Sequence, residues 1–449
     1  MPTKIEPDYE NIHEYEFYPA NLLTEYQQCI DEGLDIAAYK DVFTAVYHLP
    51  NNAHKKALGD VLFQVVCNAK QRENYPYNEP SDFASIQALR KPHTYTQTLP
   101  ADMEDRLLGA WLGRICGCML GKPIEGIHTD ELIPFLKETG NYPLHRYVLR
   151  TDVTEETLQK YQFPFNIDCY ADVLTGMPPD DDTNYMVLYQ EIIEKYGRDF
   201  TSGDVAKAWL EWQPKDAYFT AERVAFCNLV GGFAPPQSAV YQNAYREWIG
   251  AQIRGDYFGY INPGKPEIAA EMAWRDACIS HTKNGIYGEM FAAAMLSVAA
   301  VNGNIKDILL GGLAQIPYTS RLYRDVMSVL TGFESGVCQA DCFQAIHQKY
   351  DEHTSHGWCH TIPNAMIVAA ALLYGGGDYQ KSICMAVETA FDTDCNAATV
   401  GSVLGMAYGS SIIPEYWTKP LHNTLHTTIF GIGSVKITDR VKMTLQHMK

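Results

Sequence analysis

Although the chain contains twelve cysteines, it has no Cys-x-x-Cys pair anywhere in its 449 residues. That spacing is typical of zinc ribbons and dithiol redox proteins, so neither class is indicated. Several cysteines stand in apolar helical stretches, where a free thiol behaves as a small hydrophobic side chain. Reduced thiols of this kind favour a cytoplasmic protein over a secreted one.

Long hydrophobic runs are also missing. The two longest, residues 365–374 and 290–301, are too short or too polar to cross a bilayer. The amino-terminal segment MPTKIEPDYENIHEYEF is acidic and lacks the hydrophobic core of a secretion signal. We therefore expect no membrane association and no export.

Basic residues are scarce, since 35 Lys and Arg stand against 54 Asp and Glu, for a formal net charge of −19. Nucleic acids are bound by clustered Lys and Arg, so we expect no nucleic-acid surface. Apolar residues make up 46% of the chain, which is typical of a folded globular protein. The length exceeds what one hydrophobic core usually absorbs and predicts one large domain with an appendage, or two domains.

The first hundred residues differ from the rest. Apolar residues at spacings of three and four predict helices over 18–30, 37–48 and 53–69. Residues 73–100 are rich in Pro, Tyr and Asn and read as a linker. We therefore predict an amino-terminal helical extension and linker over 1–100 and a catalytic domain over 101–449. The extension carries no chemical motif, and we expect it to cover the active cleft or to form a homo-oligomer contact.

From residue 101 onward no alternation of apolar and polar residues lasts long enough to predict a sheet, so we expect an all-α fold. Two of its helices carry small residues at every fourth position. In the helix 102–120 these are Gly109, Gly113, Gly117 and Gly121, and in the helix after Asp394 they are Ala397, Gly401, Gly405 and Gly409. A glycine costs about 1 kcal/mol relative to alanine inside a helix. The two stripes are therefore predicted to face each other closely in the core.

The first acidic segment reads Pro-Pro-Asp-Asp-Asp-Thr and comprises Asp180, Asp181 and Asp182. The two prolines cannot continue a helix backwards, so these carboxylates stand at the start of a helix that runs to about residue 196. One of them is expected to cap the helix. Three adjacent carboxylates repel one another unless a cation compensates, although an ordinary acidic helix start has the same appearance.

The second acidic segment contains Asp392 and Asp394, again just before a helix of small residues. Carboxylate oxygens are hard ligands that suit Mg²⁺ or Mn²⁺ better than Zn²⁺. Two such segments on facing helices favour a centre of two divalent cations. The predicted metal ligands are Asp180, Asp181, Asp182, Asp392 and Asp394.

Four segments, in this order, resemble the ADP-ribosylglycohydrolase family, which includes the dinitrogenase-reductase-activating glycohydrolases. They are RLLGAWLG to GKPIEG (106–126), the Asp-Asp-Thr that begins at Asp181, HTKNGIYGEM (281–290) and the Asp-Thr-Asp that begins at Asp392. The resemblance covers residues 101 to about 420. It implies a compact multi-helix fold and two Mg²⁺ or Mn²⁺ ions at the two aspartate motifs. It further implies that the ribose diol of the substrate binds at the metals while an activated water displaces the group on the anomeric carbon.

Carried over residue by residue, the resemblance implies catalytic roles for Glu125, Asp181 and Asp394. The chain departs from the family at two positions. Asp180 stands where the family often has Thr, and Cys395 stands where it often has Thr or Ser. Because a thiol is a soft ligand, Cys395 is not expected to bind Mg²⁺ directly.

The segment NGIYG is predicted to open a helix over 289–301, where glycines let backbone N–H groups approach a pyrophosphate. We therefore predict substrate binding by Asn284, Gly285, Tyr287 and Gly288, although an ordinary helix entry would read similarly. His281 is expected to cap or support rather than to bind metal. A zinc site is a competing interpretation of His347, His353, His356, Cys359 and His360. Of these, His360 is predicted to matter for substrate binding.

The leading interpretation is a metal-dependent hydrolase that cleaves an N- or O-ribosyl bond of an ADP-ribosylated protein or small molecule. One alternative is a metal-dependent hydrolase of another nucleoside or nucleotide. Another is a catalytically silent ADP-ribose-binding protein on the same fold, because fold alone does not fix function. Residues 214–265 show no pattern that identifies a pocket, and we expect them to shape substrate choice.

Overall fold

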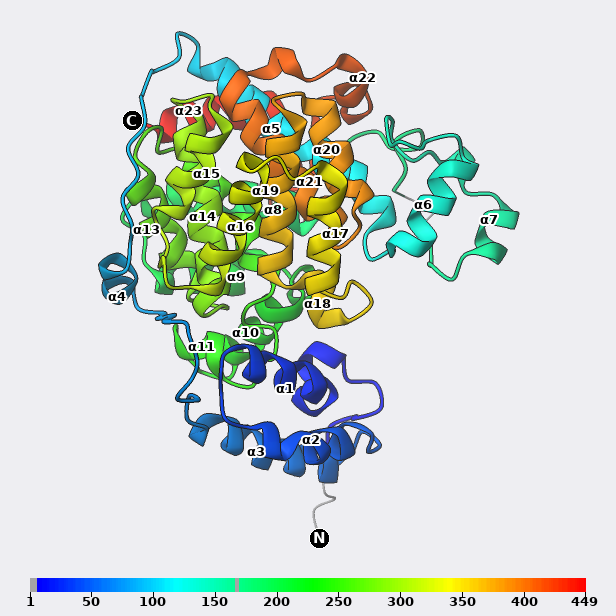
Figure 1. Cartoon of the computed structure of the whole chain (residues 1–449), viewed down its shortest axis with the longest axis vertical. Helices are drawn as coiled ribbons and strands as arrows, with labels where there is room; N and C mark the ends of the chain where they lie inside the picture. The colour runs from blue at the N-terminus through cyan, green and yellow to red at the C-terminus, as the bar shows by residue number, and fades with distance from the viewer. Residues whose placement is uncertain (1–5, 166–168) are drawn as a thin grey trace.

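The computed structural model describes residues 6–165 and 169–449, so the first five residues of the acidic amino-terminal segment lie outside these ranges. The described residues form an α-helical bundle resting on a smaller helical layer (Figure 1). This architecture confirms the prediction of an all-α fold. No helix in these ranges combines the length and the apolar character needed to span a membrane.

Two helices cross at the centre of the bundle, α5 (Met103–Gly121) and α21 (Thr393–Tyr408). A Cβ atom built on Gly113 would lie 2.1 Å from the carbonyl oxygen of Gly401, and one on Gly117 would lie 2.1 Å from that of Ala397. The prediction that the two small-residue stripes face each other is therefore confirmed. At the end of the stripe, Gly121 packs against the backbone of Asp394, so the close approach brings the second acidic segment to the end of α5.

The remaining helices surround this pair. After α5 along the chain come α6 (Thr129–Glu138), α7 (Glu155–Lys160), α8 (Asp181–Tyr196), α9 (Ser202–Trp212), α10 (Thr220–Val230), α11 (Gln237–Val240), α12 (Asp256–Tyr260), α13 (Pro266–Ala277) and α14 (Lys283–Ala299). They are followed by α15 (Ile305–Leu313), α16 (Arg321–Glu334), α17 (Gln339–Lys349), α18 (Ser355–Cys359), α19 (Thr361–Gly375), α20 (Tyr379–Glu388), α22 (Glu415–Thr418) and α23 (Ile437–His447). Helices α6 and α7 project sideways from the bundle (Figure 1).

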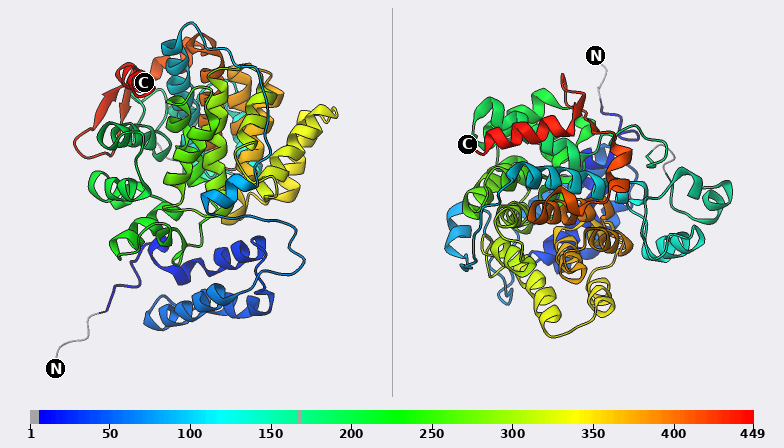
Figure 2. Two further views of the ribbon diagram at one scale, coloured as in Figure 1. Left: turned by 90° about the vertical axis from the view of Figure 1, so that its left-hand side faces the viewer. Right: turned by 90° about the horizontal axis from the view of Figure 1, so that it is seen from above.

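The amino-terminal helices form their own layer at one end of the bundle (Figure 2). Their bounds, α1 (Leu22–Asp31), α2 (Lys40–Tyr47) and α3 (Ala53–Asn68), agree with the three helices expected there. The layer has a small core of its own, made of Tyr18, Leu22, Phe43, Val46, Leu62 and Phe63. The segment 73–100 then runs along the side of the bundle and contains one short helix that the sequence did not indicate, α4 (Phe83–Ala88).

A two-stranded antiparallel hairpin, β1 (Thr424–His426) and β2 (Ser434–Lys436), adds to the helical fold. Strands of three residues are too short to show a readable alternation of apolar and polar residues, so neither strand was predicted. Met177 pairs with this hairpin, because its N–H donates to the carbonyl of Thr424 and its carbonyl accepts from the N–H of His426, both at 2.9 Å. The hairpin thereby fixes the chain just before the first acidic segment.

Candidate metal and active site

The two acidic segments meet at one cavity. Helix α8 begins at Asp181 and α21 at Thr393, and both starts lie at the carboxyl-terminal end of α5. Ligand atoms of Cys118, Asp180, Asp182 and Asp394 lie within 4.8 Å of one another, as do those of Asp392, Asp394 and Cys395. The cavity has a volume of about 260 Å³, and its lining includes Glu125, Asp180, Asp181, Asp392 and Cys395.

Asp180 caps helix α8. Its Oδ1 accepts a hydrogen bond from the N–H of Asp182 at 2.9 Å, and its Oδ2 lies 2.5 Å from the ammonium of Lys122. Burial raises the pKa of this carboxyl, but the positive charge and hydrogen bonds of its neighbours, Lys122 foremost, lower it more, so the pKa is lowered overall. Asp180 is therefore an ionised cap, as one of the three aspartates was expected to be.

Asp182 is fully buried and does not line the cavity. Its Oδ1 lies 2.8 Å from Nη2 of Arg114, and its Oδ2 accepts from the thiol of Cys395 at 3.1 Å. Arg114 also pairs with Asp256 at 2.9 Å. Asp182 thus holds the start of α8 against α5 and α21, and the thiol of Cys395 is occupied by this carboxylate.

The other four carboxylates have no Lys or Arg partner among the described residues, although Oδ2 of Asp392 accepts from the thiol of Cys359 at 3.7 Å. Oδ1 of Asp392 is buried and has no hydrogen-bond partner among the described residues. Burial first and the charge of Asp394 second raise the pKa of Asp392. Burial and the neighbouring carboxylates Asp180 and Asp394 likewise raise the pKa of Asp181. For Glu125, which is exposed to the cavity, the charge of Asp394 is the main cause of the raised pKa and burial the second.

The balance of charge indicates what this site holds. It contains six carboxylates, namely Glu125, Asp180, Asp181, Asp182, Asp392 and Asp394. Ion pairs neutralise two of them, through Lys122 and Arg114. Within the described part of the chain, no Lys or Arg pairs with the other four. Clustered carboxylates that lack basic partners are the ligand set of Mg²⁺ or Mn²⁺, so the residues present fit divalent cations.

Lys122 and Arg114 were missed by the sequence analysis. A signal existed, because both interrupt a helical stretch that is otherwise apolar and rich in glycine, and a basic residue there needs a buried acidic partner. Cys118 was also missed. It lies on the same face of α5, one turn before Lys122, and the sequence offers no reason to prefer it over the other buried cysteines.

One wall of the cavity comes from the region 214–265, where no pattern was readable. It contributes Asp216, Phe219, Glu222, Trp248 and Gly250, among others. Oε1 of Glu222 accepts from Nη1 of Arg254 at 2.7 Å. Burial raises the pKa of Glu222 to about 7, although Arg254 opposes the shift. These side chains are scattered along the chain, which explains why the sequence did not reveal them.

The predicted start of the helix after the segment NGIYG was wrong. Helix α14 begins at Lys283, so Gly285 and Gly288 lie inside the helix instead of in a loop before it. A Cβ on Gly285 would lie 2.6 Å from the carbonyl oxygen of Arg246, and one on Gly288 would lie 2.6 Å from Thr361 Cγ2. Both glycines are therefore needed for close packing, and neither lines the cavity.

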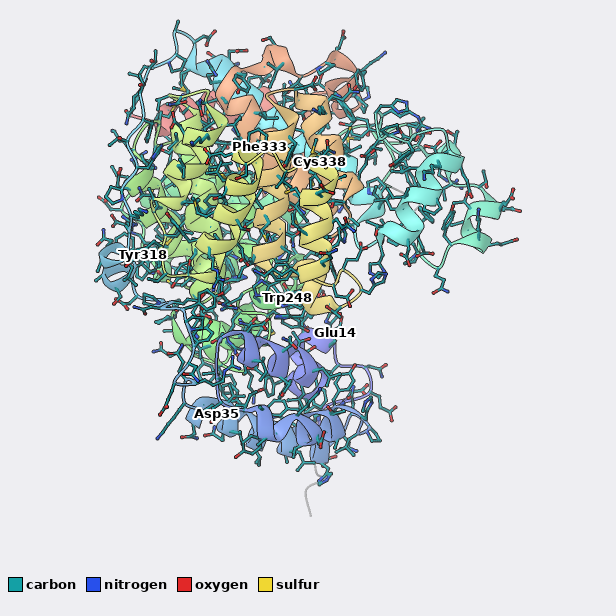
Figure 3. All side chains as sticks on the ribbon, in the orientation of Figure 1. Glu14, Asp35, Trp248, Tyr318, Phe333 and Cys338 are labelled. Carbon is teal, nitrogen blue, oxygen red and sulfur yellow. The ribbon has the colours of Figure 1, made fainter. Side chains whose placement is uncertain are left out.

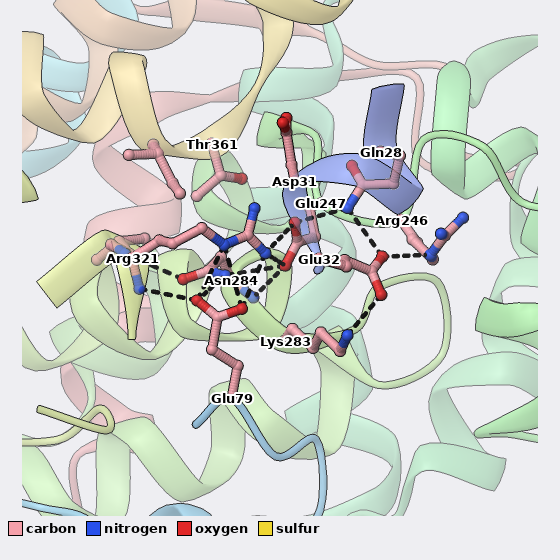
Figure 4. A network of polar contacts seen from close by, with 12 residues as sticks. Gln28, Asp31, Glu32, Glu79, Arg246, Glu247, Lys283, Asn284, Arg321 and Thr361 are labelled. Atoms are coloured by element: carbon pink, nitrogen blue, oxygen red, sulfur yellow. Dashed lines mark hydrogen bonds and ion pairs between the residues drawn. The ribbon is translucent and has the colours of Figure 1, made fainter. Parts of the chain in front are cut away.

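The polar side chains of that segment are also occupied. The amide of Asn284 donates to Glu79 and to Glu247, each at 2.9 Å (Figure 4). The hydroxyl of Tyr287 donates to the carbonyl of Pro80. Neither residue lines the cavity. Glu79 and Pro80 belong to the segment 73–100, so these hydrogen bonds join that segment to α14. The polar atoms that were expected to bind substrate are bonded to protein groups instead.

The histidine cluster does not converge on a zinc ion. His356 pairs with Asp31 at 2.9 Å, while His353 lies beside Asp130 and Asp351 at the surface. The ring of His360 is buried, and its Nδ1 caps α19 by accepting from the N–H of Ile362. His360 is not part of the cavity lining, whereas the two residues before it in the chain, Trp358 and Cys359, are. His360 is thus placed to support the wall.

Comparison with known proteins agrees with the resemblance seen in the motifs. A search of the curated proteins finds no match. A solved structure described as "ADP-ribosylglycohydrolase-related protein complex" is similar at 18% identity and a TM-score of 0.49, over 78% of this chain and 99% of that one. The sequence model of ADP-ribosylglycohydrolase matches residues 99–444, well over half of the chain, and the chain therefore belongs to the ADP-ribosylglycohydrolase family.

Proposed function

We propose that this hydrolase cleaves an N- or O-ribosyl bond of an ADP-ribosylated protein or small molecule and releases ADP-ribose, with two Mg²⁺ or Mn²⁺ ions in the acidic cavity. The family supplies the general class of reaction. The observation that carries the proposal is a group of four carboxylates without basic partners among the described residues. Glu125, Asp181 and Asp392 line the cavity, and Asp394 lies beside Asp392. Such a cluster is stable only when cations or protons reduce its charge.

We assign the cations to Asp181, Asp392 and Asp394, together with Asp180, which also lines the cavity. Asp182 keeps α8 in register through Arg114, so its contribution is to position its neighbours. Bound divalent cations would supply Lewis-acid polarisation of the ribose hydroxyls and of water.

Glu125 is the group we assign to proton transfer. It stands in the loop just after α5, and its side chain is open to the cavity. In protein without metal, the negative charge of Asp394 raises the pKa of the Glu125 carboxyl. A carboxyl with a raised pKa can donate its proton to a leaving oxygen or nitrogen and can then take one from water.

The test is release of ADP-ribose from a panel of substrates. Protein stripped with a chelator is incubated with peptides ADP-ribosylated on arginine or serine, with NAD, and with plain nucleosides, and Mg²⁺ or Mn²⁺ is then restored. We expect ADP-ribose to appear only after a cation is added. Asp394→Asn should abolish this release. The matched control Asp439→Asn, on the exposed surface of α23, should retain it.

Three other outcomes would contradict the proposal. Turnover confined to plain nucleosides would indicate a nucleoside hydrolase. Tight ADP-ribose binding without turnover at any cation concentration would indicate a binding protein. Full turnover in the presence of chelator would show that the carboxylates act without cations.

A further inference from the structure

A second, larger cleft adjoins the acidic cavity. Its volume is about 770 Å³, and it is lined on one side by the amino-terminal layer and on the other by residues 349–358. Three aromatic residues, Tyr15, Trp248 and Trp358, line both the cleft and the cavity. Figure 3 labels Trp248 and Glu14 at the junction between the layer and the bundle. The extension therefore contributes side chains to the surroundings of the acidic site.

The aromatic wall between the two spaces is braced by ring contacts. Tyr15 packs edge-on against Tyr245 at 5.3 Å between ring centroids, and Tyr245 packs edge-on against Trp248 at 4.7 Å. The indole N–H of Trp248 donates to Nδ1 of His356 at 3.3 Å. Aromatic rings fixed in this way offer large flat contact areas at a low entropic cost.

Ion pairs hold the amino-terminal layer in place at this wall. Glu16, next to Tyr15, lies 2.8 Å from Lys215 and 2.7 Å from Arg223. Deeper in the junction, Glu32 lies 2.7 Å from Arg246 and 2.5 Å from Lys283 (Figure 4). Buried ion pairs of this kind fix geometry, because an unpaired buried charge is costly. Tyr15 is thus a fixed part of the wall.

The cleft is acidic and carries no unpaired base among its described residues. Glu14 has no basic partner in the described ranges, and Asp31 and Asp351 also line the cleft. The ammonium of Lys349 lies 2.5 Å from Asp325, outside the lining. Burial lowers the pKa of His356, so its ring adds no positive charge near neutral pH. Such a cleft disfavours phosphates and carboxylates and favours positive charge.

We propose that this second cleft binds a planar, positively charged group of the substrate, with Tyr15 and Glu14 as specificity-determining residues supplied by the amino-terminal extension. Flat cations lie well against aromatic rings, and a nearby carboxylate strengthens the attraction. The inference rests on the proposed function only in assigning that group to the substrate of the acidic cavity, since the cleft itself can be tested without turnover.

The binding test uses three matched probes on the full chain, namely 1-methylnicotinamide as a planar cation, nicotinamide as its neutral counterpart and nicotinate as its anionic counterpart. Affinities are measured by calorimetry and by quenching of tryptophan fluorescence. We expect the cation to bind at least about tenfold more tightly than the anion. Equal affinity of the three probes, or preference for the neutral or anionic one, would overturn the proposal.

Variants test the two assigned residues. Tyr15→Ala and Glu14→Gln should each weaken binding of the cation by about fivefold to tenfold, while Tyr15→Phe should stay within about twofold of the wild type. Val61→Ser, an exposed change on the same layer, is the control for general effects. Unchanged Tm values show that the variants fold. Unchanged affinity in both Tyr15→Ala and Glu14→Gln would contradict the assignment.

Hydrolysis is measured separately with the same proteins, so that the two proposals can fail independently. If the wild type binds the cation as expected but releases no ADP-ribose from any substrate, the proposed function fails and the cleft stands. If ADP-ribose is released while the probes show no preference for the cation, the cleft proposal fails alone. With both intact, Tyr15→Ala should raise KM for NAD, which carries a pyridinium, more than for ADP-ribose 1″-phosphate.

Discussion

Arg114 and Asp182 form an ion pair that solvent does not reach, with Nη2 of the guanidinium 2.8 Å from Oδ1 of the carboxylate and side-chain exposures of 1% and 0%. The Nε of the same arginine donates to the backbone carbonyl of Asp182 at 2.8 Å. Arg114 on α5 thereby holds the first turn of α8 through both the side chain and the backbone carbonyl of Asp182. The acidic site depends on this contact, because the first turn of α8 and its cap residue carry three of the six carboxylates.

Removal of the Arg114 guanidinium is expected to destabilise the fold. In Arg114→Met, the carboxylates of Asp182 and Asp256 stay buried without a counter-charge, which costs about 3–5 kcal/mol. Thermal and urea unfolding measure the loss. The control is Lys56→Met, which breaks an exposed pair with Asp60 and should change stability by less than about 1 kcal/mol. A loss in Arg114→Met no larger than in the control would mean that the buried pair does not support the site.

Replacing glycine by alanine is predicted to lower stability where α5 and α21 touch and to raise it where a glycine has no close neighbour. Gly113→Ala adds a methyl group 2.1 Å from a carbonyl oxygen of α21, so the helices must separate, at a cost of about 1–3 kcal/mol. Gly203→Ala meets nothing nearer than 3.6 Å and should stabilise α9 by up to about 1 kcal/mol. Equal Tm shifts in the two variants would argue against backbone contact.

The raised pKa of Glu222 predicts that the stability of the metal-free protein depends on pH. Its pKa is raised to about 7 from the ordinary value of 4.5, so folding favours its protonated form. The contribution of Glu222 to the free energy of unfolding is fully present below pH 4.5. It is lost as the pH rises to 7, by about 3 kcal/mol in total. The charged neighbours that act on it are Arg254 and Asp276.

Glu222→Gln cannot ionise and should lack this loss. The difference in unfolding free energy between variant and wild type should therefore move in favour of the variant from pH 4.5 to pH 7.5. Denaturant titrations at a series of pH values measure it, with the exposed Glu267→Gln on α13 as control. A difference that is constant with pH would show that the carboxyl of Glu222 is not perturbed.

Neutralising one carboxylate of the cluster should have opposite effects with and without metal. Without cations, Asp392→Asn relieves repulsion from Asp394 and is expected to raise Tm. With Mn²⁺ at a hundredfold excess over its Kd, the wild type should gain about 2.7 kcal/mol for each bound ion, and the variant should gain less. Differential scanning fluorimetry and Mn²⁺ titration calorimetry measure both effects. A variant less stable than the wild type in chelator would indicate that the aspartate has a structural partner.

Much of the fold was readable because its signals are local. The helices of residues 18–69 follow from apolar spacing. Prolines before an acidic helix start predicted that one of the three aspartates caps α8, and the structure shows that it is Asp180. The facing stripes of α5 and α21 were predictable because glycine in a helix is costly unless a backbone packs against it. The misplaced start of α14 shows the limit of such signals, since Gly285 and Gly288 serve packing that the sequence does not display.

The sequence alone determined the all-helical fold, the family and the two acidic segments, because each is encoded in residues close together in the chain. Only the tertiary structure decided that Lys122 and Arg114 neutralise two of the carboxylates, that Glu222 and Trp248 form a wall, and that Tyr15 reaches it from the other end of the chain. The reason is physical: charge balance and cavity shape depend on distances between side chains, and folding sets those distances for residues that sequence spacing does not relate.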